Sequence, residues 1–179
     1  KSITYREKTS LSNIKKFNVN SEYVVDKAPL NFRWIGYINY IFPNSKIIHC
    51  TRNPMDICWS NFKHHFSSKA LSYSYNQSIL GEFYNLYFDL MNYWNNKFPN
   101  KIYEACYENL IKNKDEEIKK LIKFCNLEWN PKCLDFHNNK KSVNTASLSQ
   151  VRQPIYKSSV KSWEPFSKHL LELEKIIKK

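Results

Sequence analysis

Glycine is scarce in this sequence of 179 residues, which contains only Gly36 and Gly81. A loop that wraps a phosphate with its backbone N–H groups needs glycine where the chain turns sharply. Neither glycine stands in a GxxxxGK[ST] or similar pattern, so the sequence excludes a glycine-rich phosphate loop within its own bounds. An uninterrupted apolar run of about 18 residues is also lacking, and we therefore predict no membrane-spanning helix in this sequence.

The cysteines lack the spacing of a disulfide framework or a structural zinc site. They are odd in number, lie in apolar segments and form no CxxC pair. These residues are Cys50, Cys58, Cys106, Cys125 and Cys133. We interpret them as buried free thiols of a reducing compartment, which favours a cytoplasmic over a secreted protein. His49 precedes Cys50, but neighbours in a strand point to opposite faces, so we predict no metal site there.

Arginine is rare although the chain is strongly basic, with a formal net charge of +12. The charge favours an anionic ligand, a nucleic acid or a membrane surface, and the alternative is a solvated lysine-rich surface. Among 28 Lys and Arg residues, the arginines are Arg6, Arg33, Arg52 and Arg152. In such a chain we expect arginine where a planar, bidentate fork is needed.

The order of apolar patterns predicts one α/β domain over residues 1–179, with residues 1–21 as a lead-in. Strands are expected at 22–27, 46–51 and 101–108, and helices at 31–42, 53–66, 79–98 and 112–125. Residues 67–78 are expected to form a loop, as is the polar stretch before a final helical tail. Alternating strands and helices predict a mainly parallel sheet flanked by helices, which binds ligands at the carboxyl ends of its strands.

One strand-to-helix junction combines several anion-binding features. In "KIIHCTRNPMDICWSNFKHHF", residues 46–66, Asn53 can cap a helix that has Pro54 in its first position. Arg52 adds a bidentate fork beside the N–H groups of that helix end. Ser60 follows Arg52 by eight positions, about two helical turns, and would face the same side. The alternative interpretation is a capped helix with a surface arginine.

Several separated motifs together resemble one enzyme family. The motifs "DKAP", "FPNSKIIHCTRNPMDICWS", "YENL", "TASLSQVRQPIY" and "SVKSW" are collinear from Glu22 to Trp163. They are similar to sulfotransferases that use 3'-phosphoadenosine 5'-phosphosulfate (PAPS), above all to the tyrosylprotein sulfotransferase-like branch and its bacterial, tetratricopeptide-repeat-associated relatives. The resemblance implies a P-loop NTPase-like fold and transfer of a sulfuryl group to a hydroxyl or phenol of a peptide, sugar or small molecule, without a metal.

The resemblance also implies roles for individual residues. Arg52 and Ser60 match the pair that binds the 3'-phosphate, and Tyr107 of "YENL" matches the tyrosine near the adenine. Lys27 matches the lysine near the transferred sulfuryl group, where an ammonium would stabilise charge on the bridging oxygen. Ser147 falls where a hydroxyl contacts the 5' phosphosulfate side.

Of three further positions, two depart from the family pattern. The tyrosylprotein branch has another arginine one turn beyond the serine, and here that position is His64. Arg152 lies in the long polar loop and is expected to order that loop or to contact the ligand. Many relatives carry a basic residue just before Trp163, whereas here the lysine is one place earlier, at Lys161.

The family's phosphosulfate-binding loop has no counterpart in this sequence. We therefore expect an incomplete domain: the C-terminal portion of a sulfotransferase, without the phosphosulfate loop, the first strand or an identifiable general base. The chain alone is expected to bind PAPS or adenosine 3',5'-bisphosphate through the 3'-phosphate and adenine half and to be inactive or poorly active.

Two other functions compete with this interpretation. Lysines interleaved with aromatic residues would also suit a non-catalytic module that binds RNA or single-stranded DNA. A P-loop kinase relative is disfavoured by the missing Walker loop and by the lack of an obvious Mg²⁺-holding carboxylate. We rank the sulfotransferase first and the nucleic-acid module second.

Overall fold

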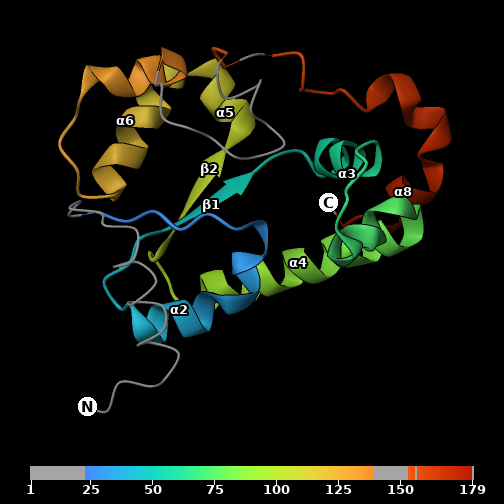
Figure 1. Ribbon diagram of the computed structural model, residues 1–179, viewed down its shortest axis with the longest axis horizontal. Coiled ribbons are helices and arrows are strands. Elements are labelled where there is room, and N and C mark those ends of the chain that lie inside the picture. Colours follow the sequence, from blue (N-terminus) through green and yellow to red (C-terminus); the bar gives the residue numbers. More distant parts are fainter. Residues whose placement is uncertain (1–22, 139–152, 156, 179) are drawn as a thin grey trace. The chain divides into compact units, whose positions relative to one another are not determined.

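The computed structural model describes residues 23–138, 153–155 and 157–178 (Figure 1). The chain divides into two compact units, Lys1–Ser45 and Lys46–Lys179. The first unit contains the 3₁₀-helix η1 (Pro29–Trp34) followed by the helix α2 (Ile35–Ile41). These two elements confirm the helix predicted over residues 31–42. Proline at the start of η1 fits this position, because its missing N–H needs no partner there.

The strand predicted at residues 22–27 is wrong for the part that the structure describes. Residues 23–28 are irregular, and Val25 is 89% exposed. The β-branched residues favour an extended chain, but a strand also needs a neighbour for its backbone N–H and C=O groups. The described residues of this unit provide no such neighbour, so propensity alone does not produce a strand.

The second unit is built on two parallel strands. Strand β1 (Ile47–Thr51) pairs with β2 (Ile102–Cys106) in a register that sets His49 opposite Glu104 and Thr51 opposite Cys106. Figure 1 shows the two arrows side by side and pointing the same way. Parallel strands need a long crossover, and here the helices α3 and α4 lie between them in sequence. This arrangement confirms the predicted α/β class with a parallel sheet.

Helices make up most of the second unit. They are α3 (Pro54–Phe62), η2 (Lys69–Tyr75), α4 (Gln77–Lys97), α5 (Tyr107–Lys112), α6 (Lys114–Phe124), η3 (Pro131–Asn138), η4 (Glu164–His169) and α8 (Leu171–Ile176). The predicted helices 79–98 and 112–125 are confirmed as α4 and α6. The predicted loop at 67–78 is wrong, because η2 occupies most of it.

Two predicted boundaries are also wrong. Helix α3 ends at Phe62, not Phe66, because the hydroxyl of Tyr75 hydrogen-bonds both the backbone N–H and the C=O of Phe66 and holds that residue outside the helix. Strand β2 ends at Cys106, not at residue 108. Its neighbour β1 ends opposite Cys106, so the chain beyond has no partner strand and turns into α5.

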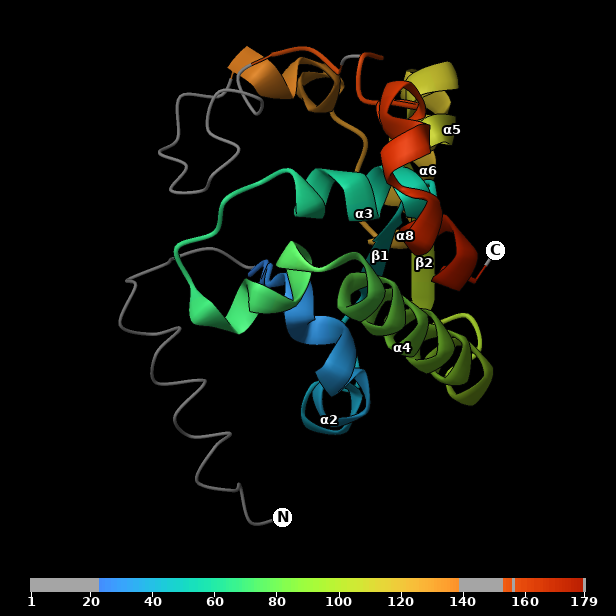
Figure 2. The ribbon, with the colours of Figure 1, turned by 90° about the vertical axis from the view of Figure 1, so that its right-hand side faces the viewer.

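The core of this unit joins α3, α4 and the C-terminal segment (Figure 1, Figure 2). It contains Met55, Cys58, Leu80, Tyr84, Leu170, Leu173 and Ile177. Gly81 permits the close approach of α4 and α8, because a Cβ at this position would lie 2.8 Å from Cγ2 of Ile176. The core therefore anchors the end of the chain against the helix that follows β1.

All five cysteines are free, as predicted. Cys58 is fully buried in the core, and this burial raises the pKa of its thiol to about 12. The prediction of burial is wrong for Cys50, which is exposed because alternate residues of β1 point outward. None of the helices in the described residues is long and apolar enough to cross a membrane.

Candidate functional site

The junction between β1 and α3 begins as the sequence predicts. The side chain of Asn53 caps α3 by accepting a hydrogen bond from the backbone N–H of Asp56 at 3.2 Å, and Pro54 occupies the first helical position. This cap fixes the chain direction immediately after Arg52. Arg52 is thereby placed at the carboxyl end of β1, where parallel sheets bind ligands.

Arg52 contacts three residues, and its buried Nε has no hydrogen-bond partner among the described residues. Its Nη2 donates to the backbone carbonyl of Ser159 and lies 3.4 Å from Oδ1 of Asp56. Its Cζ lies 5.3 Å from the ring centroid of Tyr107, within cation–π range. Its Nε is buried without a hydrogen-bond partner among the described residues. A buried guanidinium N–H without an acceptor is costly, so this atom indicates a place for an anionic oxygen.

Asp56 connects this junction to the C-terminal segment. Its side chain is fully buried and accepts hydrogen bonds from the backbone N–H groups of Lys161 at 2.7 Å and Ser162 at 2.8 Å. The hydroxyl of Ser162 also lies 3.1 Å from Oδ1 of Asp56. Lys161 has a φ of 59°, the left-handed conformation that a residue with a side chain adopts rarely. The carboxylate therefore holds a strained turn against the start of α3.

The junction between β2 and α5 supplies carboxylates to the first junction. Oε1 of Glu108 accepts a hydrogen bond from the backbone N–H of Asn53 at 2.8 Å, and its Oε2 lies 3.3 Å from Sγ of Cys106. The hydroxyl of Thr51 donates to Oε1 of Glu104 at 3.1 Å. Each of these two carboxylates therefore binds a donor from the neighbouring β1–α3 segment.

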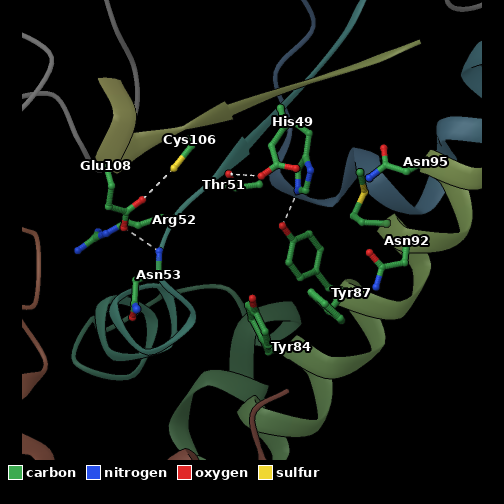
Figure 3. A pocket seen from close by; sticks show the side chains of 13 residues that line it. His49, Thr51, Arg52, Asn53, Tyr84, Tyr87, Asn92, Asn95, Cys106 and Glu108 are labelled. Atoms are coloured by element: carbon green, nitrogen blue, oxygen red, sulfur yellow. Dashed lines mark hydrogen bonds between the residues drawn. The ribbon is translucent and has the colours of Figure 1, made fainter. Parts of the chain in front are cut away.

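A pocket of about 460 Å³ opens at these carboxyl ends (Figure 3). In Figure 3, Arg52, Asn53 and Glu108 lie on one side, and His49 and Tyr87 lie on the other. The lining residues come from β1, the start of α3, α4 and β2 with the start of α5. They are His49, Thr51, Arg52, Asn53, Tyr84, Tyr87, Phe88, Met91, Asn92, Asn95, Glu104, Cys106 and Glu108.

A histidine–tyrosine pair lies in the same pocket. Nε2 of His49 is 2.5 Å from the hydroxyl of Tyr87, and Nδ1 of His49 is buried without a partner among the described residues. Burial lowers the pKa of His49, although the carboxylate of Glu104 opposes this shift. Burial also raises the pKa of Tyr87. The imidazole is therefore neutral near pH 7, and the phenol keeps its proton.

The predicted 3'-phosphate and adenine residues are only partly gathered in one place. Arg52 and Tyr107 are in contact. Ser60 lies partly buried on α3 and is not among the residues that line the pocket. His64 lies beyond the end of α3, exposed, with its ring centroid 4.6 Å from that of Phe66. His64 is thus outside the helix that was expected to carry it.

The remaining predicted residues lie elsewhere. Lys161 contributes its backbone N–H to Asp56, while its side chain is 71% exposed and its Nζ lies 3.0 Å from Glu164. Lys27 is exposed in the irregular start of the first unit. Ser147 and Arg152 lie outside the described residues, so their roles stay predictions.

Sequence reasoning missed the acidic residues that organise the site. Asp56 and Glu108 stand in the motifs that carry the resemblance, but the roles that the resemblance implies fall on the neighbouring Arg52 and Tyr107. A usable signal was present, since an acid in the first turn after a capped Pro is favourable and can bind backbone donors. For Glu104, the strand register that sets it opposite His49 was not readable from local sequence. No cluster of three potential metal ligands occurs among the residues described here.

Comparisons with known proteins place the chain in a family. A protein of Aquifex aeolicus (strain VF5), described there as an "Uncharacterized protein", is 35% identical over 169 residues, covering 93% of this chain and 22% of that protein. A Caenorhabditis briggsae protein named "Putative protein-tyrosine sulfotransferase" is 26% identical over 143 residues, covering 77% of this chain and 51% of that protein. The chain thus spans about half or less of these relatives. Because the profile of the sulfotransferase family matches residues 3–131, the chain belongs to that family.

Proposed function

We propose that this chain contributes the 3'-phosphate and adenine half of a sulfotransferase that uses PAPS as donor. Family membership supports sulfuryl transfer in general. The observation that carries the choice of donor site is Arg52 at the carboxyl end of β1, whose buried Nε has no acceptor in the part of the chain that the structure describes. A phosphate oxygen would complete this donor, and the adjoining ring of Tyr107 provides a flat surface for a base.

Other residues have proposed supporting roles. Ser60 would donate its hydroxyl to the same phosphate, Lys161 would add positive charge near it, and His64 would offer a ring N–H. Lys27 would place an ammonium near the bridging oxygen, where negative charge develops as the sulfuryl group leaves. Ser147 and Arg152 would approach the 5' side of the donor. When bound, the nucleotide supplies the sulfuryl group, and this chain's residues orient it and neutralise its charge.

The proposal extends to the longer protein and its acceptor. We propose that the phosphosulfate-binding loop and the first strand of a P-loop-like fold are supplied by sequence outside these 179 residues. The small share of the relatives that this chain covers supports that view. The acceptor is a hydroxyl or phenol, and the name of the Caenorhabditis briggsae relative favours protein tyrosine.

The proposal is tested by ligand-dependent thermal stability. We expect adenosine 3',5'-bisphosphate to raise the melting temperature of this chain more than adenosine 5'-monophosphate does. Only the bisphosphate carries a 3'-phosphate whose oxygen can accept a hydrogen bond from Nε of Arg52. Arg52→Ala should weaken bisphosphate binding about 30-fold or more, the scale of a lost charge-assisted hydrogen bond. The matched control is Arg33→Ala, a change at an exposed arginine of the first unit, which should leave the shift intact.

Two results would contradict the proposal. Equal stabilisation by both nucleotides, or a bisphosphate shift that survives Arg52→Ala, would exclude the assigned 3'-phosphate site. A steeply salt-dependent shift with a short RNA, insensitive to Arg52→Ala and without any bisphosphate effect, would instead support a nucleic-acid-binding module.

A further inference from the structure

We infer that Asp56 is a positioning residue that couples the anion site at Arg52 to the docking of the C-terminal turn at residues 159–162. The inference rests on the proposed function, because it treats Arg52 as the phosphate-binding group. Asp56 itself is not expected to touch the nucleotide. It acts through the guanidinium and through the backbone that its carboxylate holds.

The first observation is the completeness of the contacts around this carboxylate. A fully buried carboxylate is costly unless donors satisfy both oxygens. Oδ2 of Asp56 accepts from the N–H of Lys161, and Oδ1 accepts from both the N–H and the hydroxyl of Ser162. Its own backbone N–H is bound by the Asn53 cap. Asp56 is therefore fixed by α3 on one side and by the turn on the other.

The second observation is that Arg52 takes part in the same closed set of contacts. Nη2 of Arg52 lies 3.4 Å from Oδ1 of Asp56 and also donates to the carbonyl of Ser159. The guanidinium thus contacts the turn directly and, through Asp56, indirectly. The buried Nε of the same guanidinium has no hydrogen-bond partner among the residues that the structure describes.

The third observation is the conformation of the turn. Lys161 adopts a left-handed φ of 59°, which costs energy for a residue with a side chain. The side chain of Lys161 is mostly exposed, so packing does not hold this conformation. The two backbone hydrogen bonds to Asp56 do so instead. Loss of the carboxylate should release the turn together with Arg52.

The consequence is a reciprocal coupling. If Asp56 links the guanidinium to the turn, an anion that orders Arg52 also stabilises the docked turn, and undocking the turn weakens anion binding by the same factor. The difference from a purely structural role is selectivity. A structural residue would change the stability of the chain, whereas a positioning residue also changes the preference for a ligand that carries a 3'-phosphate.

The test measures affinity for adenosine 3',5'-bisphosphate and for adenosine 5'-monophosphate by calorimetry. Asp56→Asn should lower bisphosphate affinity about tenfold and leave the monophosphate unchanged. In an Arg52→Ala background the same change should have no further effect on bisphosphate affinity, which is the signature of coupling in a double-mutant cycle. Asp89→Asn is the matched control, since Asp89 is an acid on α4 that pairs with Lys178.

A milder variant covers the case in which Asp56→Asn does not fold. Ser162→Ala removes one hydroxyl donor to Asp56 and should lower bisphosphate affinity about threefold.

In the wild type, bisphosphate should slow amide hydrogen exchange at residues 157–163. An unchanged ratio of the two affinities in the variants, or unchanged exchange in a wild-type chain that binds bisphosphate, would overturn the inference. If the proposed function itself is wrong, the wild-type chain will bind the bisphosphate no more tightly than the monophosphate. That result would also overturn the inference about Asp56.

Discussion

The two strand-to-helix junctions of the second unit occupy equivalent places at the ends of paired parallel strands, yet they carry opposite chemistry. The β1–α3 junction presents donors: the guanidinium of Arg52, the backbone N–H of Asn53 and the hydroxyl of Thr51. The β2–α5 junction presents acceptors, the carboxylates of Glu104 and Glu108. The first helix has a side-chain cap, and the second has none.

The two junctions thus line one pocket with side chains of different chemistry. The capped junction carries the guanidinium of Arg52, while the other accepts hydrogen bonds from polar groups of its neighbour and places the Tyr107 ring beside Arg52. A helix N-terminus alone would not distinguish them, because both strands lead into helices. The side chains at the two ends distinguish the junctions, and our proposal assigns the anion to the one that carries Arg52.

Among changes that test this difference between the junctions, the largest expected effect on stability comes from Glu108. Glu108→Ala removes the acceptor of the Asn53 N–H, and we expect the free energy of unfolding to fall by about 1.5 kcal/mol in urea denaturation. Affinity for adenosine 3',5'-bisphosphate should not fall, because a negative charge beside the pocket is removed. Glu128→Ala, at an exposed position, should change stability by less than about 0.5 kcal/mol. A loss of affinity in Glu108→Ala would show that Glu108 belongs to the anion site itself.

A somewhat smaller effect is expected from the helix cap. Asn53→Ala deletes the hydrogen bond to the N–H of Asp56 and should destabilise the chain by about 1 kcal/mol. Asn113→Ala is the matched control, because Asn113 precedes α6 without a side-chain cap bond. Equal losses of unfolding free energy in the two variants would show that the Asn53 cap does not stabilise α3. Urea denaturation monitored by circular dichroism makes the comparison.

The smallest expected effect is a pH dependence from His49, which faces Glu104 across the strand pair. Burial lowers the pKa of His49 in the folded chain below its usual 6.5, so the unfolded chain binds more protons in mildly acidic solution. Stability should therefore fall as pH drops below about 6.5. His49→Gln should flatten the dependence of stability on pH in this range. The measurement is the urea midpoint of unfolding between pH 7.5 and 5, the range in which histidine titrates. An identical slope in the variant would assign the loss to other groups.

The sequence predicts local features well where a single signal decides them. Asn53 and Pro54 identify the start of α3, and the apolar run of β1 identifies a strand in a parallel pair. The rarity of arginine and the motif around it select Arg52, which proves to be partly buried, with an Nε that has no hydrogen-bond partner among the described residues. In each case a few neighbouring residues determine the local feature, so a short stretch of sequence is enough to predict it.

The sequence fails where partners distant in the chain decide. The run at residues 23–27 has strand propensity, but the described part of its unit offers it no neighbouring strand. Asp56 is important because of two N–H groups more than a hundred residues away, and Glu108 because of the β1–β2 register. Such contacts depend on tertiary packing, which no local pattern specifies.

The long separation of these contacts also has a consequence for biosynthesis. Arg52 and Asp56 bind residues 105 to 107 positions further along the chain. During translation the β1–α3 junction leaves the ribosome early, but its guanidinium and carboxylate must wait for residues 159–162 before their partners exist. These contacts cannot close before residues 159–162 have been synthesised, so until then Asp56 lacks the backbone donors that its carboxylate binds in the folded chain.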